Sequence, residues 1–231
     1  MKYNKVERGI FKKRPNRFIA YVEINGREEI CHVKNTGRCK ELLVPGAKVF
    51  VNKSDNPNRK TKYDLISVCK GERLINMDSQ APNKVFHEWL LKETYFKNVS
   101  LIKPETVFGH SRFDFYIEAD NRKIFAEVKG VTLEEESVVM FPDAPTERGI
   151  KHINTLCSCV EQGYGGCIAF VIQMKGVKYF TPNVKTHSAF AEALKMAKSK
   201  GVDIICLDCN VEKDALEILS LIDISEPTRH A

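Results

Sequence analysis

Two short alternating segments, separated by four turn-forming residues, constrain the fold of this chain more than any other feature. Residues 112–118 (RFDFYIE) and 123–129 (KIFAEVK) alternate between apolar and polar side chains, and the tetrapeptide ADNR lies between them. This pattern predicts a β-hairpin. If Asp120 and Asn121 form a two-residue loop, the numbers of opposed residues sum to 241.

The register predicts which side chains share a face of the hairpin. One face carries only apolar pairs, namely Phe113–Val128, Phe115–Ala126 and Ile117–Ile124. On the other face Asp114 lies opposite Glu127, and the period of two brings Lys129 beside Glu127. Two opposed carboxylates repel each other, and a hard cation such as Mg²⁺ would convert that repulsion into a binding site.

The chemistry that suits these three residues is metal-assisted hydrolysis of a phosphodiester. Asp114 and Glu127 would hold the ion, and Lys129 would orient the attacking water or offset charge on the phosphate. The alternative is that all three are ordinary solvent contacts on an exposed sheet. Tyr116 and Phe125 share the face, which indicates that it is covered, and unpaired charges seldom stay under cover.

Length and composition set broad limits. With 231 residues the chain can hold one large or two small domains. The sequence has no apolar run of about 18 residues and no signal peptide, so we expect a cytoplasmic protein without membrane partners. Eight cysteines in a reducing compartment do not predict disulfides. Cys206 and Cys209 have the spacing of half a zinc site, and structural thiols are the favoured reading over metal ligands.

Charge is distributed unevenly along the chain. Residues 1–80 carry a net charge of +9 and residues 81–231 carry −3. A basic amino-terminal part is typical of a module that binds a polyanion, although a lysine-rich surface without such a role is common.

The first part of the chain predicts a small barrel. Four short segments have strand character: residues 18–24, 27–33, 47–51 and 63–69. Short strands without a long helix favour a five-stranded OB-like barrel over residues 1–80. Its loops would carry residues 12–14, 34–38 and 58–60, and the nucleic-acid ligands expected there are Lys34, Asn35, Arg38, Arg59 and Lys60. The glycine turn at residues 35–38 suits phosphate, and a plain turn is equally consistent with it.

The remainder, residues 81–231, predicts a mixed α/β domain. Ser79 would cap a helix that runs through Asn83 to Glu93, and the hairpin follows. Further along we expect a strand at 131–141, a helix at 146–162, a strand at 167–174, a helix at 188–200 and a strand at 202–207. Residues 215–224 are ambiguous between strand and helix. Two strand–helix–strand steps after an antiparallel start give a mixed sheet with helices on its faces.

Six blocks of residues, in order along almost the whole chain, carry a resemblance to a known family. They are Asn35-Thr36-Gly37, Ser54-Asp55-Asn56, 111–115 (SRFDF), 127–129 (EVK), 141–144 (FPDA) and 146–152 (TERGIKH). Through these blocks the chain resembles the sugar fermentation stimulation protein A family. The resemblance implies an OB-fold domain followed by a PD-(D/E)XK nuclease-like domain, and it implies DNA binding.

Within the nuclease-like pattern, Asp114 matches the first acid, Glu127 the second acid and Lys129 the lysine. A helix before the core often supplies another acidic metal ligand, which the resemblance assigns to Glu88. The sequence departs from the pattern in one respect, because Phe113 rather than proline precedes Asp114.

The 146–152 block predicts a basic helix flank. Arg148, Lys151 and His152 are three and four residues apart, so they cluster on one side of a helix and could contact the scissile phosphate. An exposed helix face without a ligand is the alternative.

Two functions remain in competition at this point. The first is a Mg²⁺- or Mn²⁺-dependent nuclease that acts on DNA or RNA. The second, which the resemblance to the family implies, is a non-catalytic DNA-binding regulator of sugar (maltose) metabolism genes, although the sequence has no helix-turn-helix signature. The oligomeric state stays open between a monomer and a homodimer.

Overall fold

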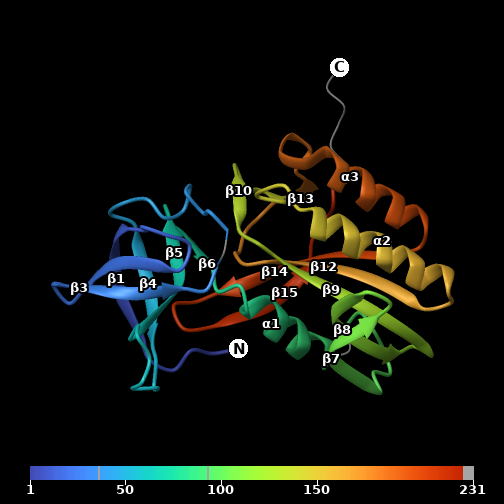
Figure 1. Ribbon diagram of the computed structural model, residues 1–231, viewed down its shortest axis with the longest axis horizontal. Coiled ribbons are helices and arrows are strands. Elements are labelled where there is room, and N and C mark those ends of the chain that lie inside the picture. The colour runs from blue at the N-terminus through green and yellow to red at the C-terminus, as the bar shows by residue number, and fades with distance from the viewer. Residues whose placement is uncertain (36, 93, 226–231) are drawn as a thin grey trace.

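A computed structural model gives the arrangement of the chain in two lobes (Figure 1). It describes residues 1–35, 37–92 and 94–225. Thr36 of the expected glycine turn and Glu93 of the expected helix lie outside the described residues. Within that part of the chain, no helix has the length and apolar character needed to cross a membrane.

The amino-terminal lobe is a closed OB-like barrel. Its strands are β1 (Val6–Lys13), β2 (Ile19–Ile24), β3 (Arg27–Val33), β4 (Lys48–Lys53), β5 (Tyr63–Lys70) and β6 (Arg73–Asn76). The strand order is β3-β2-β1-β4-β5-β6, and a parallel pairing of β3 with β5 closes five strands into a barrel. Alternate residues of β2, Ala20, Val22 and Ile24, fill its interior. The predicted barrel is therefore confirmed.

Local details of the barrel follow the sequence in part. Asn25 and Gly26 both have positive φ, as a two-residue turn between β2 and β3 requires. The prediction missed β1 and placed Lys12 and Lys13 in a loop, whereas both belong to that strand. β1 is hard to recognise because charged residues at both of its ends interrupt the alternation.

The predicted helix cap at Ser79 is wrong. The helix α1 (Ala81–Leu90) starts after Gln80, whose own side chain does not cap it. The Ser79 hydroxyl donates a hydrogen bond to the Lys34 carbonyl instead, while Asp78 Oδ1 accepts one from the Gln80 backbone N–H. Ser79 thus ties the start of the second lobe to the barrel.

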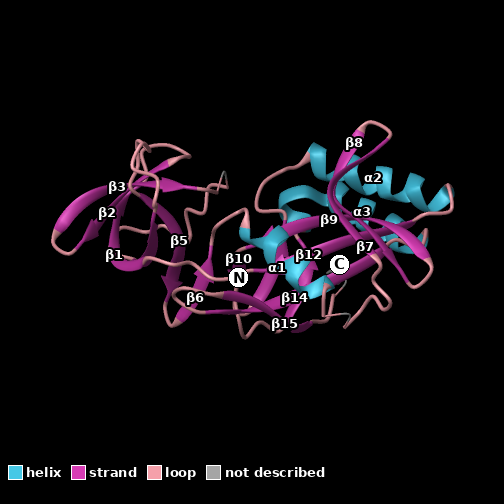
Figure 2. Cartoon of the chain, turned by 90° about the horizontal axis from the view of Figure 1, so that it is seen from below, coloured by secondary structure: helices cyan, strands magenta, loops and turns pink. Residues whose placement is uncertain are grey.

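The second lobe contains a mixed six-stranded sheet with the order β15-β14-β12-β9-β8-β7. The bounds are β7 (Leu101–Phe108), β8 (Ser111–Ala119), β9 (Arg122–Val131), β12 (Gly165–Ile172), β14 (Asp203–Val211) and β15 (Leu216–Leu221). The strands β9, β12 and β14 are parallel, and α2 (Glu147–Glu161) and α3 (Val184–Ser199) make the two predicted crossovers. α2 and α3 cover one face of the sheet and α1 covers the other (Figures 1 and 2).

Three predictions for this lobe need correction or completion. The single strand expected at 131–141 is divided, because Glu136 and Ser137 have positive φ and turn the chain. The resulting β10 (Leu133–Glu135) and β11 (Val138–Phe141) form a separate small sheet with β13 (Tyr179–Pro182). The ambiguous tail forms β15, which pairs antiparallel with β14, and β7 was not predicted at all.

The register of the central hairpin is confirmed over five pairs. Phe115 pairs with Ala126 and the pattern continues to Ala119 and Arg122, with positive φ at both loop residues. The ladder ends there, however, so the expected backbone pairs of residues 113 with 128 and 114 with 127 do not form. A carboxylate interrupts them, because Asp114 Oδ2 accepts a hydrogen bond from the Val128 backbone N–H at 2.8 Å.

The expected apolar face is broken at the same point. Phe113 packs against the Phe125 ring at 5.8 Å between centroids, on the α2 side, whereas Phe115 packs against Phe86 of α1 on the other side. Glu105, next to β8 in β7, has positive φ, which marks an irregularity in the neighbouring strand at this level. The strands are therefore strongly distorted where Asp114 lies.

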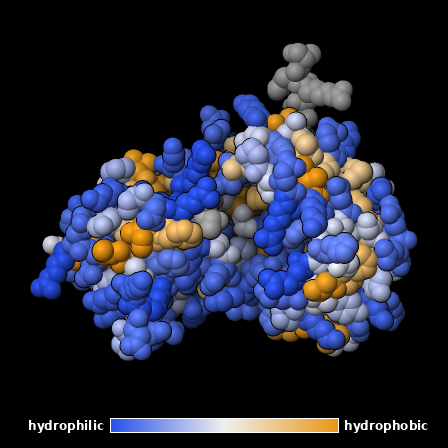
Figure 3. Space-filling model, viewed as in Figure 1, coloured by the Kyte–Doolittle hydropathy of each residue, from blue (hydrophilic) through white to orange (hydrophobic). Residues whose placement is uncertain are grey.

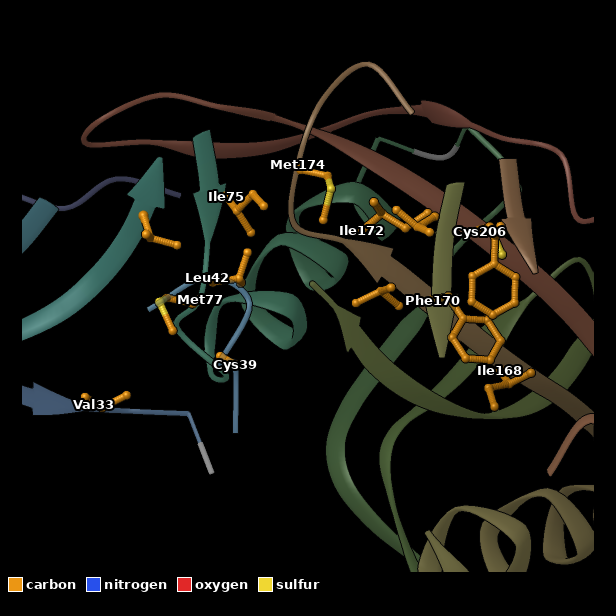
Figure 4. Close-up of a cluster of buried hydrophobic side chains, with 14 of the residues drawn as sticks. Val33, Cys39, Leu42, Ile75, Met77, Ile168, Phe170, Ile172, Met174 and Cys206 are labelled. Atoms are coloured by element: carbon orange, nitrogen blue, oxygen red, sulfur yellow. The ribbon is translucent and has the colours of Figure 1, made fainter. Parts of the chain in front are cut away.

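One apolar cluster runs from the barrel into the second lobe. Figure 4 shows Leu42, Ile75 and Met77 from the barrel side facing Ile172 and Met174 at the end of β12. The two lobes thus share a continuous buried core, which holds the barrel next to the carboxyl end of β12.

Candidate active site

Glu127 is the most buried carboxylate of the predicted site, with 4% of the residue exposed. Its Oε1 lies 2.5 Å from Lys129 Nζ and 2.5 Å from His152 Nδ1. Its Oε2 is buried and has no hydrogen-bond partner among the described residues. A buried acceptor without a partner is costly, so this oxygen calls for a ligand.

The surroundings keep Glu127 ionised. Burial alone would raise its pKa, but the contacts with His152 and Lys129 outweigh burial and hold the pKa below its usual value. The carboxylate therefore presents a full negative charge in a site with little access to water.

Asp114 lies beside this group and is half-buried. Its Oδ1 accepts a hydrogen bond from Asn83 Nδ2 at 2.8 Å, and its Oδ2 accepts the Val128 N–H described above. Burial, and then the charge of Glu127, raise its pKa, and the hydrogen bonds from Val128 and Asn83 offset only part of this. The two acids therefore repel each other electrostatically.

This donor set fits a hard divalent cation. Asp114 and Glu127 offer carboxylate oxygens, one of them without a partner. Mg²⁺ is commonly held by one or two carboxylates, with water and substrate oxygens completing its shell. Across the described residues, no group of three or more His, Cys, Asp or Glu side chains converges as a complete ligand set. The protein would therefore supply only part of the coordination.

The structure separates Glu88 from this site. Glu88 Oε2 forms an ion pair with the α-amino group of Met1 at 2.7 Å, and half of its side chain is exposed. Asn83 is the α1 residue that reaches Asp114. Five residues separate the two positions, which places them about 140° apart around a helix. Sequence reasoning missed Asn83 because nothing in the local pattern shows which turn of α1 meets Asp114.

His152 is brought to the site in a different role from the expected one. Only 5% of the residue is exposed, and its ring contacts Glu127 and the Phe113 ring rather than solvent. The sequence does carry a signal, because Gly149, His152, Ile153 and Leu156 follow one buried stripe of α2.

Arg148 and Lys151 remain on the surface of the same helix. Both are exposed, and neither forms an ion pair with a described residue. The phosphate-binding role expected for Arg148 and Lys151 therefore stays a prediction.

The predicted ligands of the barrel divide into two groups. Arg59 donates two hydrogen bonds to the buried Asp64, at 3.0 and 2.6 Å, and Lys34 Nζ lies between Asp64 and Asp78 at 3.3 and 3.4 Å. Asn35 is also used internally, since its amide bonds the Met77 carbonyl and the Gly37 N–H. The structure does not place these three as free ligands.

The other two predicted barrel ligands, Arg38 and Lys60, are exposed and have no ion-pair partner in the described part of the chain.

Cys206 and Cys209 do not form half of a zinc site. Both are buried on β14, with Cys206 in the core beneath α2 and α3 and Cys209 in the core beneath α1. Residues three apart on a strand point to opposite faces. Burial raises the pKa of both thiols, which disfavours the thiolate that zinc requires.

Comparison with known proteins identifies the family. Residues 80–215 match the family described as the sugar fermentation stimulation protein RE domain, and residues 13–77 match the SfsA N-terminal OB domain. A sugar fermentation stimulation protein homolog from Clostridium beijerinckii is 59% identical over 224 residues, which cover 97% of this chain and 99% of the relative. A second homolog, from Desulfitobacterium hafniense, is 62% identical over 217 residues, covering 94% and 95%.

A solved structure gives the same result. SfsA of Pyrococcus furiosus in complex with Ca²⁺ is similar with a TM-score of 0.86 and 29% identity, covering 97% of this chain and 98% of that one. The chain belongs to the sugar fermentation stimulation protein family.

Proposed function

We propose that this chain is a nuclease that hydrolyses phosphodiester bonds of DNA or RNA with Mg²⁺ or Mn²⁺. The observation that carries the proposal is the buried Oε2 of Glu127, which has no hydrogen-bond partner among the described residues. It lies beside Asp114, a second carboxylate that Glu127 repels. A Ca²⁺ complex is described for the Pyrococcus furiosus relative, and Ca²⁺ takes the same class of oxygen ligand as Mg²⁺.

In the proposed hydrolysis the residues of the chain would have the following roles. Asp114 and Glu127 would hold the ion, with Asn83 orienting Asp114 and His152 orienting Glu127. A bound divalent ion would supply charge neutralisation at the phosphate and would acidify a water. Lys129, beside Glu127 and 17% exposed at its side chain, would position that water. Arg148 and Lys151 would contact the phosphates.

The barrel would bind the rest of the strand. Arg38 and Lys60 keep free charges for the backbone, and OB-like barrels bind single strands with weak sequence preference. In this proposal the protein acts in the cytoplasm, and a homodimer would allow both strands of a duplex to be cut.

One observation favours a second candidate, a non-catalytic DNA-binding regulator of sugar (maltose) metabolism. Lys129 already balances the charge of Glu127 without any ion, and His152 contacts the same carboxylate oxygen. A site neutralised in this way could be a structural remnant of a nuclease fold.

The test is incubation with single- and double-stranded DNA and RNA in Mg²⁺, Mn²⁺ or EDTA. Glu127→Gln and Lys129→Ala should abolish product and leave binding intact. Their matched controls are Glu118→Gln and Lys123→Ala, a cross-strand pair of the same hairpin, which should cut like the wild type. Binding without product in every metal would reject the nuclease and favour the regulator.

A further inference from the structure

A polar cavity of about 190 Å³ lies between the barrel and the second lobe. Asn35, Gly37 and Ser79 line it from the barrel side, and Gly130, Phe141 and Gln173 line it from the other side. Gly130 directly follows Lys129 in β9, so the cavity lies at the carboxyl end of the strand that carries Glu127 and Lys129. Figure 3 shows the surface hollowed between the two lobes, with hydrophilic side chains on both sides.

Gln173 is the residue that indicates a ligand. It follows the last residue of β12, and only 2% of it is exposed. Its amide nitrogen is fully used, because Nε2 donates to Asn76 Oδ1 at 2.8 Å and to the Asp78 carbonyl at 3.1 Å. These bonds turn Oε1 toward Gly130, and it accepts no hydrogen bond from a described residue. The cavity is thus lined by a firmly held acceptor without a donor.

The glycine at position 130 keeps this arrangement open. A Cβ added there would lie 2.6 Å from Gln173 Oε1 and 2.8 Å from Pro82 Cγ. The location also suits a ligand site, since ligands of open α/β sheets bind at the carboxyl ends of parallel strands. β9 and β12 both end here.

Asp143, two residues after Phe141, adds a second acceptor to the lining of the cavity. Asp143 is exposed and has no ion-pair partner in the described ranges, and its Oδ2 lies 2.9 Å from the position that a Cβ on Gly37 would occupy. Arg14 holds this part of the barrel in place, because its guanidinium donates to the carbonyls of Asn35, Gly37 and Arg38. The Asp143 carboxylate therefore lies close to Gly37 of the barrel.

The remaining wall is apolar. Leu133 and Met140 are half-buried, and so is Phe141, whose ring packs against Phe170 and Phe190 at 5.6 and 5.2 Å between centroids. Two acceptors and an apolar wall suit a flat heterocycle with N–H donors. A phosphate does not fit, because the carboxylate would repel it, and a bare cation would not use the apolar wall.

We propose that this cavity receives one nucleobase with an exocyclic amino group, from the strand that is bound at the Glu127 site. In adenine, cytosine and guanine the exocyclic amino group can donate a hydrogen bond to the Asp143 carboxylate or to Gln173 Oε1. Thymine and uracil have no exocyclic amino group, and their single N3–H donor lies between two carbonyl oxygens, so they can satisfy at most one of the two acceptors and bring a carbonyl oxygen against the other. The inference rests on the proposed function, and it makes the site selective for the base beside the cut.

The test is fluorescence anisotropy in EDTA with a short oligothymidine and with the same strand carrying one central cytosine, adenine or guanine. The wild type should bind the amino-bearing strands about fivefold more tightly or better, as one good base contact provides. Asp143→Asn replaces one carboxylate oxygen by an amide NH₂ donor, so this variant should lose the preference. Glu135→Gln removes an equal charge from the exposed side of β10 and should keep it.

Gly37→Ala gives an independent check, since its methyl group would lie 2.9 Å from both Asn35 Oδ1 and Asp143 Oδ2. This variant should also lose the preference, with an unchanged thermal unfolding curve as the control for folding.

Four results would overturn the inference: equal affinity of the wild type for all strands, no binding of any strand, an unchanged preference in Asp143→Asn, or competition by free deoxycytidine as effective as that of the whole strand. The last result would indicate a small-molecule site. Adding Mg²⁺ separates this inference from the proposed function. A base preference without cutting would support the base-binding cavity and reject the nuclease proposal. Cutting without a base preference would support the nuclease and reject the base-binding cavity.

Discussion

Replacing Arg59 by alanine should destabilise the protein far more than it weakens nucleic-acid binding. Arg59 looks like a free loop cation in the sequence, but its guanidinium holds Asp64, of which only 3% is exposed. Losing one partner of a buried ion pair costs about 3–5 kcal/mol when nothing replaces it. Here Lys34 Nζ stays 3.3 Å from the carboxylate and 28% of the Arg59 side chain is exposed, so both reduce the loss.

We therefore expect a loss of about 1.5–3 kcal/mol, the range for hydrogen bonds to charged groups. In a chain of this length 2 kcal/mol corresponds to a fall in Tm of about 4–8 °C. Urea unfolding followed by circular dichroism measures the free energy of unfolding. Lys60→Ala is the matched control, because that neighbour is exposed and has no ion-pair partner in the described part of the chain. It should change the free energy of unfolding by no more than about 0.5 kcal/mol.

The pH dependence gives a second readout. Burial opposes ionisation of Asp64, but the Arg59 and Lys34 contacts hold its pKa below the usual value. A lowered carboxyl pKa stabilises the fold above the unfolded pKa of about 3.9, and this stability is lost as the pH falls through the folded pKa. The difference between wild type and Arg59→Ala should thus shrink below about pH 4. Equal stability of the Arg59 and Lys60 variants, with weaker DNA binding only for Arg59→Ala, would refute this reasoning.

Three further predictions concern the site and the core. Lys129→Met should bind Mg²⁺ about tenfold more tightly while losing activity. The substitution removes a cation that competes with Mg²⁺ for Glu127, and tenfold corresponds to about 1.4 kcal/mol of binding free energy. Calorimetric titration measures this, and weaker binding would contradict it. The pKa of Asp114 is raised by burial and by Glu127, so its contribution to stability is present below its unfolded pKa and is lost as the pH rises through its folded pKa. Relative to Asp114→Asn, wild-type stability in urea should therefore decline from about pH 4 upward without metal, and a flat difference would count against the repulsion. Cys206 and Cys209 are buried on opposite faces, so a zinc chelator should leave Tm unchanged and both thiols should react with a thiol reagent only on unfolding; early reaction of either would be evidence against this placement.

Local rules predicted the parts of the site that lie on one hairpin. Two loop residues with positive φ fix the register of β8 against β9, and the period of two then places Glu127 and Lys129 together. These contacts depend on residues close in sequence, so no knowledge of the tertiary fold was required.

Contacts between distant elements were not predictable in the same way. Asn83 reaches Asp114 from a helix 31 residues away, and the spacing of α1 alone cannot select it over Glu88. His152 and Arg59 were predicted to bind nucleic acid because a sequence does not show which acidic group each basic side chain contacts. For Arg59 the sequence did offer a signal: Asp64 lies within a strand of buried residues, and a buried acid requires a partner.

The break in the hairpin ladder explains why the site forms where it does. β9 pairs with β8 only as far as Ala126, but it continues beside β12 to Val131. From Glu127 onward one side of β9 is therefore free of backbone pairing, and Figure 2 shows β8 bending away from it. The Asp114 carboxylate occupies the first vacated N–H, at Val128, which draws its charge toward Glu127.

A regular ladder would have given a different site. With β8 paired to the end of β9, Asp114 would meet Glu127 as a direct cross-strand neighbour, and the Val128 N–H would bond the backbone instead of the Asp114 carboxylate. The same divergence leaves Gly130 uncovered at the carboxyl end of β9, where it meets Gln173 and the cavity. The candidate metal centre and the candidate base pocket are thus consequences of one structural event, the parting of two strands after Ala126.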